Sequence, residues 1–123
     1  MKKIAMPVML LAALMASASA MAGDIGYASP EAALTALRAM PDTTVREEND
    51  WFVVYDKANA TIWSITSEKN PAHPTAVKRA FVARDGGVSI VTNVMCGARK
   101  EVCDVVVEQF QQINDGLRQR MQR

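Results

Sequence analysis

The chain has 123 residues, 14 basic and 13 acidic side chains, and two cysteines, Cys96 and Cys103. This length suits one domain beside a short targeting segment. With a net charge this close to zero, the chain lacks the excess of positive charge that would attract nucleic acid or an anionic membrane, so neither is expected as a partner.

The first 22 residues have the features of a secretory signal peptide. Lys2 and Lys3 precede an apolar run over 4–15, which is too short to span a bilayer because spanning takes about 20 residues. Ala20 and Ala22 complete an A-x-A cleavage site, with cleavage after Ala20 as the alternative. We expect removal of residues 1–22, no stable membrane insertion afterwards, and a single domain over 23–123. The compact leader is typical of bacteria, so the expected location is the periplasm or the exterior.

Export changes the composition of the mature domain. The leader takes two lysines with it, so 12 basic residues remain against 13 acidic ones and the net charge is −1. An exported chain with two cysteines meets an oxidising compartment, where a disulfide forms and persists.

A helix is predicted over residues 30–40. Ser29 suits the position before a helix because its side chain can accept a hydrogen bond from a free backbone N–H. Pro30 suits the first helical position, and Glu31 complements the positive end of the helix dipole. Apolar residues then recur at helical spacing until Pro41 ends the pattern.

The middle of the chain predicts an antiparallel meander of four to five strands. Asp85-Gly86 is the strongest hairpin signal, and a two-residue turn there places Phe81 opposite Ile90, on the same face as Cys96. The strand from Trp51 has apolar residues on both faces, which is typical of a strand covered on both sides. The expected strands are 43–47, 51–56, 61–66, 76–84 and 87–96.

A long helix is predicted from Arg99 or Lys100 to the C-terminus. An apolar residue recurs every three or four positions, and this stripe should pack on the sheet: Cys103, Val106, Phe110, Ile113, Leu117 and Met121. Cys96 ends a strand with its side chain toward the same interface. We therefore predict a structural disulfide between Cys96 and Cys103, in an α+β fold.

Two surfaces are candidates for binding a partner. The first is the sheet face opposite Cys96, formed by Ala80, Val82, Val91 and Met95. The alternative is that the first helix covers this face and makes it ordinary core. The second candidate is the loop 67–75, with Pro71, His73 and Pro74, because its prolines force an extended, irregular backbone.

The residues offer few reactive groups. His73 is the only histidine, six residues separate the two cysteines instead of the two of a C-x-x-C motif, and the only paired glycines belong to the hairpin. No catalytic residue, metal or cofactor is therefore expected. Four acids lie close in sequence and keep a carboxylate-dependent hydrolase as an alternative: Glu47, Glu48, Asp50 and Asp56.

The expected function is that of a small secreted, non-enzymatic protein that binds a macromolecular partner in the envelope. An inhibitor, an immunity-type protein and an assembly accessory all fit, and the partner is an unknown protein or envelope component. The alternative is a small-molecule carrier with a pocket between the C-terminal helix and the sheet. That pocket would be lined by Phe81, Ile90, Phe110 and Trp63.

Overall fold

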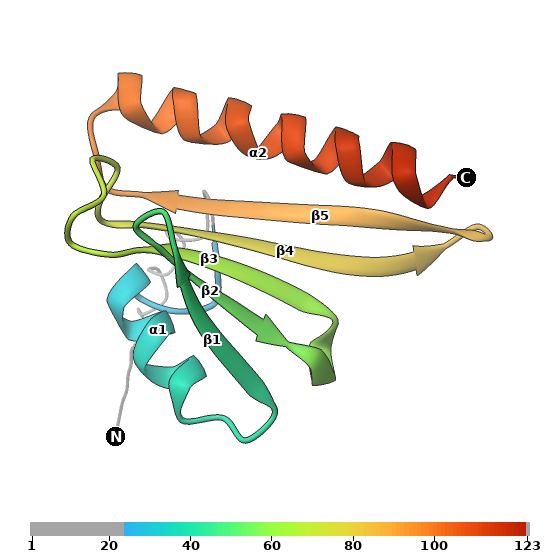
Figure 1. The fold of residues 1–123 in the computed structure, drawn as a ribbon, viewed down its shortest axis with the longest axis horizontal. Coiled ribbons are helices and arrows are strands. Elements are labelled where there is room, and N and C mark those ends of the chain that lie inside the picture. Colours follow the sequence, from blue (N-terminus) through green and yellow to red (C-terminus); the bar gives the residue numbers. More distant parts are fainter. Residues whose placement is uncertain (1–23, 123) are drawn as a thin grey trace, which may run out of the picture.

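The computed structural model describes residues 24–122, so the predicted signal peptide lies outside the described residues. Two α-helices, five strands and one short 3-10 helix follow each other along the chain (Figure 1). Their bounds are α1 Pro30–Arg38, β1 Thr43–Glu48, β2 Trp51–Asp56, η2 Lys57–Asn59, β3 Thr61–Thr66, β4 Thr75–Arg84, β5 Gly87–Cys96 and α2 Lys100–Met121. The predicted α+β class is confirmed.

Helix α1 begins where the sequence predicts. The side chain of Ser29 accepts a hydrogen bond from the backbone N–H of Ala32 at 3.0 Å, and Pro30 occupies the start of the first turn. Ala33 and Leu37 are buried one turn apart on the inner side of the helix. The helix is thus fixed by a cap at its beginning and by a narrow apolar stripe.

The five strands form one antiparallel sheet in which each strand pairs with its neighbours in the chain. At the turn between β4 and β5, Asp85 and Gly86 both have positive φ, as a tight two-residue hairpin requires. Phe81 lies opposite Ile90, so the predicted register is confirmed. Because side chains alternate along each strand, this register also decides which side chains share a face.

The two helices pack on opposite faces of the sheet (Figure 1). We call these the α1 face and the α2 face. On the α1 face, helix α1 and the segment before it bury a compact apolar cluster: Ile25, Ala33, Leu37, Val54, Trp63, Ile65 and Ala76. On the α2 face, Val106 and Phe110 pack against Val77 and Ala72. Helix α2 runs along β5 and leaves β2 and β3 without a helix above them on that face.

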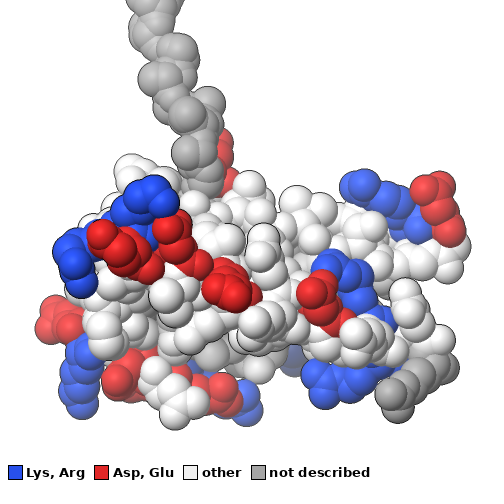
Figure 2. Space-filling model, turned by 90° about the horizontal axis from the view of Figure 1, so that it is seen from above, with Lys and Arg blue, Asp and Glu red and all other residues white. Residues whose placement is uncertain are grey.

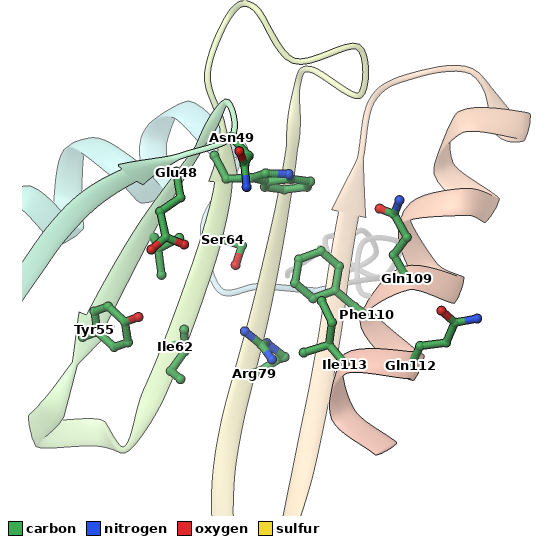
Figure 3. A pocket seen from close by; sticks show the side chains of 12 residues that line it. Glu48, Asn49, Tyr55, Ile62, Ser64, Arg79, Gln109, Phe110, Gln112 and Ile113 are labelled. Carbon is green, nitrogen blue, oxygen red and sulfur yellow. The ribbon is translucent and has the colours of Figure 1, made fainter. Parts of the chain in front are cut away.

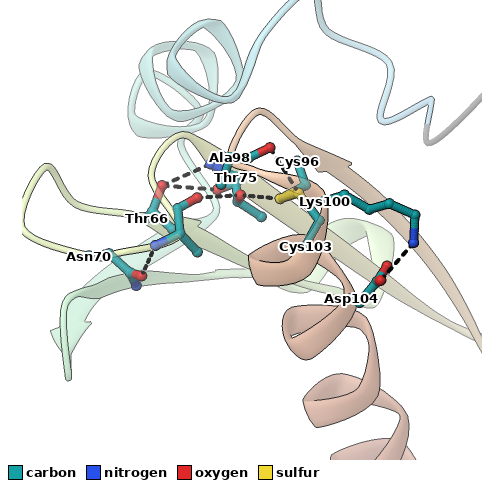
Figure 4. The surroundings of a disulfide bond; sticks show 9 residues. Thr66, Asn70, Thr75, Cys96, Ala98, Lys100, Cys103 and Asp104 are labelled. Carbon is teal, nitrogen blue, oxygen red and sulfur yellow. Dashed lines mark hydrogen bonds and ion pairs between the residues drawn. A yellow bond between two sulfur atoms is a disulfide. The ribbon is translucent and has the colours of Figure 1, made fainter.

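The predicted disulfide joins the end of β5 to the first turn of α2 (Figure 4). Cys96 and Cys103 are seven positions apart, with their Cα atoms 5.9 Å from each other. The hydroxyl of Thr75, which is fully buried, lies 3.0 Å from the Cys96 sulfur. The bridge therefore sits at the common end of β4, β5 and α2 and fixes where the helix leaves the sheet.

The loop between β3 and β4 is held at both ends of its path. The side chain of Asn70 donates to the backbone oxygen of Asp50 at 2.9 Å, in the turn between β1 and β2. The backbone N–H of Gly97 donates to the oxygen of Pro74 at 2.7 Å. A Cβ on Gly97 would lie 3.0 Å from the Pro74 ring, so any larger residue here would push Pro74 away.

Charges of both signs are interspersed on the surface seen from above (Figure 2). The ion pairs are exposed ones, such as Lys100 with Asp104 one turn later in α2. Exposed pairs contribute little to stability, because water screens them. Between residues 24 and 122, no helix is both long and apolar enough to cross a membrane.

Candidate functional site

A groove of about 630 Å³ lies on the α2 face, between helix α2 and the uncovered parts of β2 and β3 (Figure 3). Its floor includes the cross-strand row of Tyr55, Ile62 and Arg79, which face each other through the register of β2, β3 and β4. The other lining residues are Glu48, Asn49, Trp51, Val53, Ser64, Gln109, Phe110, Gln112 and Ile113. The groove is largely open to solvent, with helix α2 as one wall.

Three aromatic side chains line the groove: Trp51, Tyr55 and Phe110. The rings of Trp51 and Phe110 meet edge to face, with 5.5 Å between their centroids. Phe110 is buried, whereas Trp51 and Tyr55 are only partly buried and keep ring surface toward the groove. Ile113, 46% exposed, adds apolar surface from the helix. The groove therefore presents a half-buried apolar surface that could seat another apolar group.

Arg79 is the most unusual side chain in the groove. It is only 7% exposed, and its guanidinium lies over the ring of Phe110, 5.2 Å from the centroid. Its Nη1 donates to the side-chain oxygen of Asn114 at 3.4 Å, while its buried Nε has no hydrogen-bond partner among the described residues. Within residues 24–122, no carboxylate lies at ion-pair distance from it.

Burial lowers the pKa of Arg79, because the charged form loses its hydration, and the nearby Tyr55 partly opposes this shift. An arginine remains charged at neutral pH even so. The groove thus contains a buried positive charge that the described residues do not neutralise.

Asn114 connects this guanidinium to the sheet edge. The side chain is 5% exposed, and its Nδ2 donates to the hydroxyl of Thr92 on β5 at 2.9 Å. Since its oxygen accepts from Arg79, one amide ties α2 to both β4 and β5. This polar contact holds the helix wall of the groove in place.

Neither Arg79 nor Asn114 is identified as a site residue from the sequence. The signal was nevertheless present: Arg79 alternates with Val77 and Phe81, so it occupies an inward position of an apolar strand face. Asn114 follows Phe110 by one helical turn, in the apolar stripe of α2. A polar residue at a core position is the observation that points to this groove.

The predicted partner-binding face is only partly open. All four of its residues lie on the α1 face, but Met95 packs against the cluster beneath α1. Ala80 and Val82 are half-buried, and Val91 is 41% exposed. Helix α1 thus covers one end of this face and leaves the end around Val91 open, so each of the two alternatives holds for part of it.

The predicted loop borders a second hollow of about 590 Å³, beside α1. His73 Nδ1 lies 2.9 Å from the hydroxyl of Thr66, and His73 and Pro74 line this hollow. Pro71 is exposed and does not line it. The buried hydroxyl of Ser67 has no partner among the described residues.

The four residues of the expected carrier pocket do not come together, so that lining is wrong. Trp63 is buried beneath α1, where its ring contacts Tyr27. Phe110 lies on the opposite face of the sheet. Side chains alternate between the two faces along each strand. Trp63 pairs with Lys78, which points to the α1 face, whereas its neighbours Val77 and Arg79 point toward α2.

The acids considered for hydrolysis are also dispersed. Glu47 lines the hollow beside α1, while Glu48 lines the groove and pairs with Arg46. Asp56 is buried and accepts a hydrogen bond from Asn59 at 2.9 Å. In the part of the chain that the structure describes, no three potential ligands gather as a metal site would need.

The chain matches no protein-family model, no curated protein and no solved structure.

Proposed function

We propose that this protein is a non-enzymatic binding protein of the bacterial envelope, which holds a segment of a partner protein in the groove between β2, β3 and α2. The observation that carries the proposal is the half-buried aromatic surface of Trp51 and Tyr55 on an uncovered part of the sheet, beside the buried ring of Phe110 from α2. Aromatic residues with one side buried and one side free are enriched where proteins bind each other.

The shape of the groove favours a polypeptide over a small molecule. Pockets for small ligands bury roughly 70–90% of the ligand surface, whereas this groove is largely open to solvent. A protein segment brings neighbouring residues that cover its exposed side. A sheet floor beside a helix wall is also a surface on which an extended or helical segment can lie.

The envelope location is supported by two features of the chain. The first is the leader over residues 1–22, with its lysines and its apolar run. The second is the disulfide between Cys96 and Cys103, since such bonds persist in oxidising compartments.

The experiment begins with a photo-cross-linking amino acid at Gln109, an exposed position on the groove wall. After irradiation in the native host, mass spectrometry identifies the cross-linked protein and the site of attachment. The affinity of that purified partner is then measured for the wild type, Ile62→Lys and Val91→Lys. Ile62 lies on the groove floor, and Val91 is the matched apolar position on the other face.

We expect Ile62→Lys to weaken binding by at least about tenfold, the effect of losing about 1.4 kcal/mol, and Val91→Lys to leave it unchanged. Thermal unfolding of both variants checks that they remain folded. If Val91→Lys weakens binding and Ile62→Lys does not, the partner binds the α1 face, and the groove is not the site.

A further inference from the structure

We infer that the groove takes a partner segment that carries a carboxylate, and that Arg79 binds this carboxylate in a charge-assisted pair. The inference rests on the proposed function and specifies the chemistry of the ligand. It concerns the residue at the centre of the groove floor, where β4 passes beneath Phe110 (Figure 3).

The guanidinium has capacity left for a ligand. Of its five N–H donors, one reaches Asn114 over a long 3.4 Å, and Nε is unpaired among the described residues. Arg79 lines the groove, so a carboxylate bound there can approach its guanidinium. Planar guanidinium and planar carboxylate groups match in geometry, and their hydrogen bonds are about twice as strong as neutral ones.

A purely structural role does not explain the charge. The contacts of Arg79 with Phe110 and Asn114 help to attach α2, but an apolar side chain of similar length would fill the same space at lower cost. Burying a charge without a counterion costs several kcal/mol, and replacing such a charge by an apolar residue is often neutral or stabilising. A ligand that supplies the missing negative charge gives the buried arginine a role that methionine could not have.

The surroundings favour a carboxylate over a phosphate. Arg79 is the one cationic side chain in the lining of the groove. Arg46 lies beside the groove, 5.6 Å from the centroid of the Tyr55 ring, and is paired with Glu48. A phosphate group carries up to two negative charges and usually needs more donors than one guanidinium. The apolar neighbours Ile62 and Phe110 suit a segment with an apolar residue next to its acidic group.

Two sources of the carboxylate remain to be distinguished: the C-terminus of a chain and an acidic side chain. The probes are N-acetylphenylalanine, which has a free carboxylate, and its amide. A third probe, N-acetylphenylalanyl-aspartate amide, carries only a side-chain carboxylate. Inorganic phosphate is the fourth. Each is titrated to millimolar concentration against ¹⁵N-labelled protein while NMR follows the Nε–Hε signal of Arg79 and the backbone amide signals of the groove residues, which are also present in the variants.

We expect N-acetylphenylalanine to shift the Arg79 signal and its amide to bind about 10- to 100-fold more weakly, the loss of one hydrogen bond to a charged group. Binding of the aspartate amide as well assigns the site to acidic side chains, and its failure to bind assigns it to C-termini. Arg79→Met should abolish discrimination between acid and amide while the variant stays folded, with at most a small loss of thermal midpoint because the Asn114 oxygen loses its donor. Arg84→Met, at the exposed end of the same strand, is the control and should behave as the wild type.

Three outcomes would overturn the inference: equal binding of acid and amide, undiminished preference for the acid in Arg79→Met, or no response of the Arg79 signal to either carboxylate. If phosphate binds more strongly than either carboxylate probe, the ligand of Arg79 is a phosphoryl group and the inference of a carboxylate is wrong. If Ile62→Lys still weakens binding of the cross-linked partner, each of these outcomes contradicts the role of Arg79 but not the proposal that the groove binds a partner. The two proposals can therefore be tested separately.

Discussion

The two helices of this protein are attached to the sheet in different ways. Helix α1 has nine residues and buries three of them, and its apolar side closes a cluster of large side chains. Helix α2 has 22 residues and also buries only three, Val106, Phe110 and Asn114. The length of a helix therefore does not measure its share of the core. Helix α1 completes a core, whereas α2 forms a wall.

The difference has a physical basis in what each helix meets. Under α1, apolar side chains meet apolar side chains from β2 and β3. Under α2, two apolar residues are followed by a polar contact from Asn114 to β4 and β5, and a disulfide holds the first turn. The α1 side should thus dominate the free energy of unfolding, and the α2 side should be easier to open locally.

The largest expected effect is on the α1 side. Leu37→Ala removes a side chain that is fully buried in the α1 cluster and leaves a cavity, so the free energy of unfolding should fall by about 3 kcal/mol. Ile113→Ala, in exposed α2, is the control and should change it by less than about 0.5 kcal/mol. Urea unfolding measures both. Equal losses would mean that the helices contribute alike and would break the comparison.

The second effect concerns the disulfide. Replacing Cys96 and Cys103 together by alanine should cost about 2.5 kcal/mol, the chain-entropy value for a loop of about eight residues. Because the bridge fixes the first turn of α2, amide hydrogen exchange should rise most over residues 100–106. If hydrogen exchange rises equally in α1, the disulfide stabilises the whole domain and not α2 in particular.

The third and smallest effect concerns the polar contact beneath α2. Asn114→Ala leaves the Thr92 hydroxyl and Arg79 with one partner fewer, which should cost about 1–2 kcal/mol of unfolding free energy. Gln111→Ala, on the exposed side of the same helix, should cost less than about 0.5 kcal/mol. Equal values for the two variants, measured by urea unfolding, would show that this amide does not hold the wall.

Local signals predicted most of the fold. The Asp85-Gly86 turn fixes one register, and that register alone places Phe81, Ile90 and Cys96 on one face. The 3.6-residue pattern after Lys100 then places Cys103 toward the same face, so the disulfide follows from two independent periodicities. These features depend on residues close together in the chain, which is why sequence reasoning reaches them.

The site depends on long-range placement and was largely missed. Residues 51–56 carry apolar side chains on both faces, and nothing local decides which face a helix covers. Once α1 takes the face of Val54 and Trp63, the face of Trp51 and Tyr55 is left as a groove. The candidate pocket with Trp63 is wrong for the same reason. The hairpin register predicts that Arg79 points to the same face as Val77 and Phe81, so its place among apolar side chains could have been predicted from the sequence.

The meander has a kinetic consequence. Every strand pairs with the one before or after it, so the sheet assembles through short loops whose closure costs little entropy. Pairing between consecutive strands closes shorter loops than pairing between strands far apart in the chain, and shorter loops favour faster folding. The two thiols come last and only seven positions apart, with no competing cysteine in the chain, so oxidation has a single pairing to make.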